Sequence, residues 1–404
     1  MLSIYRIGFL IREKFNQNEL WSFLAQITNL IYGLVIFIIQ SKFIDSEQLS
    51  IWYVFMSLIG FSGVLELGMN QLFSRHITYI KHSNNKDNHI YKTPVKIENF
   101  IASAKYLNFR FSILVSIISL IAGFLYLRFN SNLIINNDYY ILWIFCGVGF
   151  LLVNINNFYT GAIQGINHID FIKKNQIISV AISILISITS IYYGIISFVV
   201  AYLITSIYKH ISLKIFFSKK FGKVKALSNS NISLDIIKPD LKKNVFNMIG
   251  YKLVSNGYLL ILGLFLIPGQ ISSFGLTKQV FTIMYSFSFV WISANFPSMS
   301  KLFVQNQIKL LIKTFKSYLF KALSQFVIFV IIFIIIYKII IGYFDFNVKI
   351  LDGAALILFT SYMIIEVING YFAQLLIIMN KLHFMYFSFI FSIILITLTY
   401  LMLN

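Results

Sequence analysis

The sequence predicts an all-α, polytopic membrane protein of about eleven or twelve transmembrane helices. The first observation is composition: of 404 residues, 58% are hydrophobic and only 12% are charged, against roughly 25% charged in soluble domains. The second is that long apolar segments alternate with short polar loops. Backbone groups in lipid must be satisfied within each segment, so segments of this length are expected to form helices.

A transmembrane helix needs about 20 apolar residues, and about eleven segments meet that length. The first one lacks a small-residue cleavage site, so it is predicted to be an uncleaved span rather than a secretory signal. The weakest division is the tight turn near Tyr193–Gly194. An odd number of spans places the carboxyl terminus across the membrane from the amino terminus. The predicted spans are 19–40, 50–74, 108–128, 139–161, 175–193, 195–216, 245–267, 273–299, 317–341, 353–379 and 383–403.

The basic residues are sorted between the two sides of these spans. Most of the 33 lysines and arginines fall in every second loop, and loops rich in Lys and Arg face the cytoplasm. The amino terminus is therefore predicted to be cytoplasmic. The net charge of +19 follows from this topology, so nucleic acid is not an expected partner. The intervening loops are assigned only Lys42, Arg128, Lys278, Lys338 and Lys349, and Lys252 lies inside an apolar segment.

A weak internal repeat predicts two pseudo-symmetric lobes around a central cavity. Asn156 and the residues up to Phe171 match Asn369 and the residues up to Phe384 at one constant offset, and residues 48–53 resemble residues 270–275. The pattern fits a parallel repeat whose axis runs along the membrane normal. The expected organisation is an amino-terminal lobe at 1–216, a cytoplasmic linker at 217–244 and a carboxy-terminal lobe at 245–404.

Three charged residues inside predicted spans stand out: Glu66, Lys252 and Glu366. Each costs roughly 2.5–3.5 kcal/mol on insertion scales, so such groups usually face a cavity or a partner. One interpretation is a cavity in which Lys252 binds an anionic substrate while Glu66 or Glu366 couples an ion to transport. The other is that each group satisfies a helix contact or reaches the membrane surface. A Glu66–Lys252 pair is compatible with their matched depth.

Arg75 ends the second span at the predicted cytoplasmic mouth, where an arginine can bind a phosphate with two hydrogen bonds. It can equally be an ordinary anchor at the membrane surface. Amide residues within spans can line a polar path or bond neighbouring helices, and the second use is commoner. The amides assigned to substrate binding are Asn70, Asn156, Gln164 and Asn369.

The sequence carries no sign of an enzyme, a metal site or a cofactor. The single cysteine, Cys146, lies in an apolar segment, so no disulfide framework is expected. The six histidines lack metal-ligand spacing, and no nucleophile elbow or phosphate-binding glycine loop is found. The expected protein is therefore a transporter rather than a catalyst.

Three stretches resemble the polysaccharide flippases of the multidrug/oligosaccharidyl-lipid/polysaccharide exporter superfamily, most closely the O-antigen (Wzx-type) flippases. They are LSIWYVFMSLIGFSGVLELGMNQLFSRHITYI, NNFYTGAIQGINHIDFIKKNQI and the region from Asn247 to Lys301. The resemblance covers most of the chain, although its motifs are loose. The family usually has twelve or more spans, so about eleven is a departure that puts the second lobe's last helix in doubt.

The resemblance implies two lobes around a cationic cavity that opens alternately to either side. The implied substrate is an undecaprenyl-pyrophosphate-linked oligosaccharide, such as an O-antigen repeat unit, moved across a bacterial inner membrane. Other polysaccharide-assembly proteins are the implied partners. Two alternatives stay open: a multidrug or metabolite antiporter of the same superfamily, and a membrane-embedded polysaccharide polymerase or ligase. The basic inward loops and short outward ones favour the flippase over the enzyme.

Overall fold

The computed structural model describes most of the chain as a bundle of long helices. The described residues are 17–63, 69–82, 97–130, 136–222, 249–250, 252–292, 295, 299, 302–303, 305–343, 345–379 and 384–403. Within them the regular elements are all helical, which confirms the all-α membrane fold. Seven of the described helices are long and apolar enough to cross a membrane. The remaining predicted spans correspond to α3 with α4, η2 with α10, α11, and α15.

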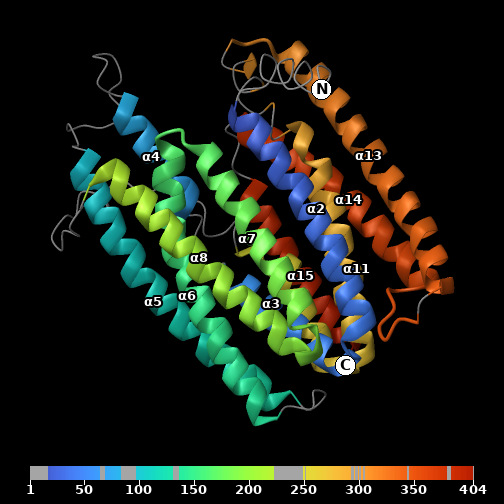
Figure 1. Cartoon of the computed structure of the whole chain (residues 1–404). Helices are drawn as coiled ribbons and strands as arrows, with labels where there is room; N and C mark the ends of the chain where they lie inside the picture. The colour runs from blue at the N-terminus through green and yellow to red at the C-terminus, as the bar shows by residue number, and fades with distance from the viewer. Residues whose placement is uncertain are drawn as a thin grey trace, which may run out of the picture.

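The amino-terminal helices comprise α2 to α8, and Figure 1 shows α4, α5, α6 and α8 on one side of the bundle. Helix α6 contacts α4, α5 and α8, while α7 contacts α2 and α8. The predicted turn at Tyr193–Gly194 is confirmed, because Gly194 has φ +61° between η1 and α8. The bounds are α2 Gln17–Phe43, α3 Ser46–Ser62, α4 Met69–His82, α5 Ile97–Phe129, α6 Asn137–Gly165, α7 Ile169–Thr189, η1 Ile191–Tyr193 and α8 Ile195–Phe221.

The carboxy-terminal helices comprise η2 to α15. Helix α11 is the central one: it contacts α2 and α3 of the first group and α13 and α14 of its own. Two ends of the bundle are distinguished below. The basic end is where α2, α5 and α13 begin and α8 ends, and the opposite end is where α2 ends and α15 ends (Figure 1). The bounds are η2 Leu253–Gly257, α10 Tyr258–Phe265, α11 Pro268–Ser288, α13 Ile308–Tyr343, α14 Gly353–Ile378 and α15 Phe384–Leu403.

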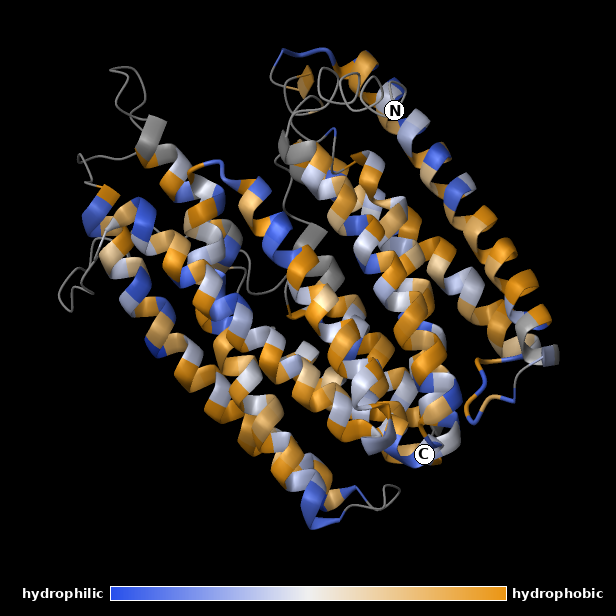
Figure 2. Cartoon of the chain, viewed as in Figure 1, coloured by the Kyte–Doolittle hydropathy of each residue, from blue (hydrophilic) through white to orange (hydrophobic). Residues whose placement is uncertain are grey.

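The surface of the bundle is apolar, and several helix contacts are lined by small polar residues. On α5 the side chains of Ser112, Ser116 and Ser119 are buried, whereas Leu114 and Ile121 are about half exposed. A soluble helix would show the reverse arrangement. Membrane helices pack through small residues and turn their large apolar side chains to lipid. Figure 2 shows this apolar colouring along the outer helices.

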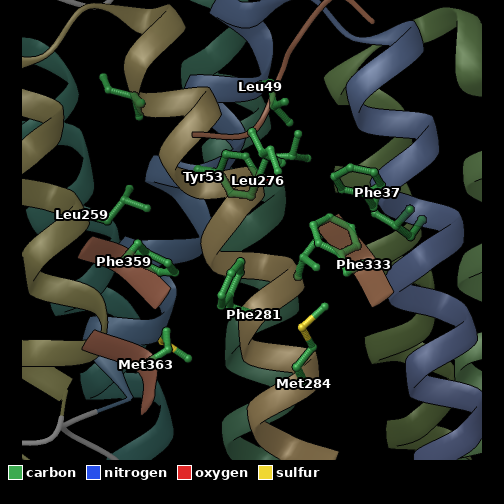
Figure 3. Close-up of a cluster of buried hydrophobic side chains, with 14 of the residues drawn as sticks. Phe37, Leu49, Tyr53, Leu259, Leu276, Phe281, Met284, Phe333, Phe359 and Met363 are labelled. Carbon is green, nitrogen blue, oxygen red and sulfur yellow. The ribbon is translucent and has the colours of Figure 1, made fainter. Parts of the chain in front are cut away.

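One hydrophobic core joins the two groups of helices. Phe37 of α2 contacts the rings of Phe333 and Tyr337 of α13, at 5.7 and 6.0 Å between centroids. Figure 3 shows Phe37 facing Phe333, and Tyr53 of α3 beside Leu276 of α11. The core therefore spans the contact between residues that are far apart in the sequence.

The two internal matches in the sequence coincide with helix boundaries. Helix α3 begins two residues before Gln48, and α11 begins two residues before Gln270. Likewise α6 ends nine residues after Asn156, and α14 ends nine residues after Asn369. The division into two lobes stays a prediction, and these boundaries are consistent with it.

Two predictions about element limits are corrected. In the second span, predicted as one segment at 50–74, α3 ends at Ser62 with Gly63 as its carboxy-terminal cap, and α4 begins at Met69. Lys278, grouped with the loop residues although the predicted span 273–299 contains it, lies inside α11, which begins at Pro268. Helix α8 continues to Phe221, past the predicted start of the linker at 217, and the linker itself stays a prediction.

Candidate intramembrane anion site

The last turn of α3 provides a small-residue surface inside the bundle. Gly60 and Gly63 are three positions apart, so they lie on the same face of the helix. Gly63 caps the helix, and its N–H bonds back to the carbonyl oxygens of Ile59 and Phe61. The carbonyl end of a helix carries a partial negative charge, which favours a nearby cation. The end of α3 is therefore suited to receive a positively charged side chain.

The side chains of Asn256 and Lys252 lie over these two glycines. A Cβ placed on Gly60 would lie 2.7 Å from the amide carbon of Asn256, and one on Gly63 would lie 3.2 Å from Nζ of Lys252. Any larger residue at either position would displace them. The absence of side chains at Gly60 and Gly63 is thus what lets an ammonium and an amide approach the end of α3.

The segment that supplies these side chains is a π-helical turn, Leu253–Gly257. A π turn shifts the backbone hydrogen-bonding pattern from i→i+4 to i→i+5, and such turns occur frequently at functional sites. Lys252 immediately precedes it and Asn256 lies within it. Asn256 also donates from Nδ2 to Oγ of Ser255, at 3.1 Å. The turn therefore presents several polar groups on the face that contacts α3.

A second lysine reaches the same turn from α11. Nζ of Lys278 donates a hydrogen bond to the backbone carbonyl of Ser255. Lys278 lies ten residues into α11, or about 15 Å along the helix axis at ~1.5 Å per residue. Lys252 and Lys278 thus both bring an Nζ atom to the region of η2, one beside Gly63 and the other at the Ser255 carbonyl. Two like charges in one interior region are mutually unfavourable, and an anion between or beside them would offset that repulsion.

Contacts between the two groups of helices lie on the side of this site nearer the opposite end. The hydroxyl of Tyr53 on α3 lies 3.1 Å from Oε1 of Gln40 and 3.0 Å from Oε1 of Gln279 on α11. Gly275 of α11 gives the Tyr53 ring the space to pack against the helix. The α3–α11 contact is therefore both close and hydrogen-bonded.

Three further hydrogen bonds join the two groups of helices nearer that end. The hydroxyl of Tyr126 donates to the carbonyl of Leu260 at 2.7 Å, and Nδ2 of Asn130 donates to the carbonyl of Gly263 at 2.9 Å. The backbone N–H of Val348 donates to the carbonyl of Ser41 at 3.1 Å. Tyr126 and Asn130 lie at the end of α5, and their partners lie in α10. Ser41 lies near the end of α2 and Val348 precedes α14, so the bundle is held together at the opposite end.

The amides predicted to bind substrate occupy other positions. Asn70 and Asn156 lie at the packing of α4, α6 and α8: the backbone oxygen of Asn70 faces Gly161, and Oδ1 of Asn156 lies 2.9 Å from Nδ1 of His210. Gln164 on α6 and Asn369 on α14 are exposed. Their contacts place Asn70 and Asn156 among the amino-terminal helices, where amides bond neighbouring helices.

The predicted charged residues are placed only in part. Glu66 lies in 64–68, outside the described residues, so the Glu66–Lys252 pair stays a prediction. Arg75 lies on α4, but its side chain is outside the described part. Glu366 is half-buried near the middle of α14, between the exposed Ile365 and the buried Val367.

Reasoning from sequence missed Lys278 and Asn256. A signal for Lys278 was present in the sequence: the predicted span 273–299 contains it, and Pro268 favours a helix start ahead of it. The role of Asn256 had no sequence signal, because it depends on the π turn and on Gly60 of a distant helix. No group of three or more His, Cys, Asp or Glu residues suited to a metal is found among the described residues.

No protein-family model matches the sequence. No curated protein matches it either. Solved structures do resemble the fold. An inward-facing multidrug resistance MATE family transporter of the MOP superfamily has a TM-score of 0.63 and 13% identity, over 92% of this chain and 83% of that chain. Lipid II flippase MurJ, in an inward closed conformation, has a TM-score of 0.59 and 15% identity, over 93% and 79%.

A third similar structure is a MOP superfamily transporter from Pyrococcus furiosus Vc1, described as having a binding pocket of reverse polarity. It has a TM-score of 0.54 and 13% identity, over 95% of this chain and 88% of that chain. At these identities the likeness concerns the fold alone. The chain is a multi-pass membrane protein with the fold shared by these MATE transporters and the MurJ flippase.

Proposed function

We propose that the protein is a flippase that moves an undecaprenyl-pyrophosphate-linked oligosaccharide across the membrane by alternating access. The observation that carries the proposal is the pair of interior lysines, Lys252 and Lys278, at the contact of η2, α3 and α11. A diphosphate carries negative charge that two ammonium groups can offset. Charge-assisted hydrogen bonds of this kind are stronger than neutral ones, and they gain further where water is scarce.

In this proposal the diphosphate and glycan enter from the basic end while the polyprenyl chain stays in lipid. Contacts such as Tyr53 with Gln279 and Val348 with Ser41 hold the opposite end closed. Arg75 would receive the diphosphate at the entrance, and Asn70, Asn156, Gln164 and Asn369 stay candidates for a polar path. Glu66 or Glu366 would couple an ion to the movement. The basic end would face the cytoplasm of a bacterial cell.

The alternative is an antiporter for amphipathic cations, as the likeness to a multidrug resistance transporter allows. Two interior lysines disfavour it, because each would repel a cationic compound near the site. A polymerase or ligase is disfavoured because the similar folds belong to transporters.

The test is complementation of a strain that lacks the gene. The deletion is expected to leave lipid-linked repeat units on the inner leaflet and to remove surface polysaccharide. The double variant Lys252→Gln/Lys278→Gln should fail to restore it. Lys338→Gln should restore it fully, because Lys338 is an exposed lysine of α13. Normal surface polysaccharide in the deletion strain, with raised drug sensitivity, would replace the flippase with the antiporter.

A further inference from the structure

A groove on the outer surface of the amino-terminal helices is separate from the interior lysines. It has a volume of about 340 Å³ and lies between the basic ends of α7 and α8. Its volume is at the lower end of the ~300–1,000 Å³ usual for ligand pockets. The groove is lined by one face of α8 and by the ring of Phe171 on α7. The α8 residues are Tyr208, Ile211, Ser212, Ile215, Phe216 and Lys219.

The floor of the groove is a rigid aromatic pair. The rings of Phe171 and Phe216 are stacked, with 3.9 Å between centroids and 16° between planes. The ring of His168 meets Phe216 edge-on at 5.5 Å. Because these rings are held by one another, the groove exists without a ligand and would lose little entropy on binding one.

The groove is amphipathic along its length. Lys219 lies at the basic end, Ile215 and Ile211 follow at 51% and 53% exposure, and Tyr208 is the deepest residue. From Lys219 to Tyr208 the helix rises by about 16 Å at ~1.5 Å per residue. This is about half of the ~30 Å hydrocarbon core, or one leaflet. The groove thus has a positively charged end at Lys219 and an apolar wall that extends over about one leaflet.

The charge at the top of the groove is positive. Lys220, next to Lys219, lies 5.8 Å from the centre of the Phe216 ring. Asp170, which precedes Phe171 of the groove, is engaged by Lys174 at 3.2 Å. That pairing reduces the negative charge presented to a ligand. Basic pockets between helices at this level of a membrane bind anionic lipid headgroups.

We propose that this groove binds one anionic phospholipid from the leaflet at the basic end. Its phosphate lies at Lys219, the Phe171–Phe216 pair supports the headgroup region, and one acyl chain follows Ile215 and Ile211 toward Tyr208. The occupant is a resident lipid of the membrane, distinct from the substrate, because the groove opens on the outer surface and not at the contact between α3 and η2.

The experiment is native mass spectrometry of the full chain in detergent, with phosphatidylglycerol or phosphatidylcholine of identical acyl chains. The wild type is expected to retain one phosphatidylglycerol more tightly than phosphatidylcholine. Lys219→Gln should weaken phosphatidylglycerol binding about fivefold, which corresponds to ~1 kcal/mol per interfacial lysine. Ile215→Trp should remove the bound lipid by filling the groove.

The matched control is Lys214→Gln, which removes an exposed lysine of the same helix that does not line the groove. It should leave binding unchanged. Equal binding of the two lipids, or equal losses in Lys214→Gln and Lys219→Gln, would overturn the proposal in favour of general surface attraction. A dimer that Ile215→Trp dissociates would overturn it in favour of a second copy of the chain.

Discussion

Lys278 shows that the role of a side chain can depend on its position in the fold rather than on its residue type alone. An interior lysine costs roughly 2.5–3.5 kcal/mol on insertion scales. Its hydrogen bond to the Ser255 carbonyl returns roughly 1.5–3 kcal/mol, as is usual for bonds to charged groups. The two contributions nearly cancel, so stability alone gives little reason for a lysine at this position. Binding of an anion supplies a reason.

We therefore expect Lys278→Met to abolish transport while changing the melting temperature little. Methionine keeps a similar length and fills the space without the charge. The measurement pairs thermal unfolding in detergent with transport of the lipid-linked substrate in vesicles. Lys278→Arg should retain substantial transport because it keeps the charge. A large fall in melting temperature with normal transport would mean that Lys278 serves structure only.

At the scale of the element, helix contact depends on small residues at fixed positions. On α6, Gly161 and Gly165 are four positions apart and face α4: a Cβ on Gly161 would lie 2.6 Å from the backbone oxygen of Asn70, and one on Gly165 would lie 2.9 Å from that of Ser74. Backbone atoms cannot move aside as a flexible side chain can. This is the spacing by which membrane helices approach closely.

Gly161→Ala should consequently destabilise the protein by about 1–3 kcal/mol, the range for an overpacked contact. The readout is the melting temperature in detergent. Gly269→Ala in the first turn of α11 is the control, since a Cβ there meets nothing within 4 Å. If both variants melt alike, the α4–α6 contact is looser than the structure indicates.

On the scale of the whole molecule, hydrogen bonds join the two groups of helices at the opposite end. The backbone nitrogen of Val348 lies 3.1 Å from the carbonyl oxygen of Ser41, so the two residues are in direct backbone contact. A disulfide spans roughly 4.4–6.8 Å between Cα atoms. The only native cysteine, Cys146, is buried, so it should not compete for an engineered partner.

We expect the double variant Ser41→Cys/Val348→Cys to form a disulfide on oxidation and to stop transport. In the proposed alternating-access mechanism this end opens, and the disulfide would hold it closed. Transport measured before and after a reducing agent is the test, with recovery on reduction expected. Transport by each single-cysteine variant should be unchanged by oxidation. Full transport by the oxidised double variant would contradict opening at this end.

Part of the fold could be predicted from the sequence because the signal is local. The length of an apolar run can be read directly from the sequence, and Gly194 marked the turn between α7 and α8. The division of the second span at Gly63 was missed, because its apolar run continues past the end of α3. Lys252 could be singled out as an interior charge, since charge within an apolar segment is visible in any sequence. Its neighbours could not be identified.

By itself the sequence determined that the chain crosses a membrane many times as helices and that its basic residues gather at one end. Hydropathy and charge act segment by segment, so no knowledge of the other segments is needed. Only the tertiary structure decided that Lys252 and Asn256 contact the glycines of α3, that Lys278 bonds the Ser255 carbonyl, and that Ser41 bonds Val348. Those contacts depend on how helices distant in sequence pack against one another. That packing depends on the shapes of side chains throughout the bundle.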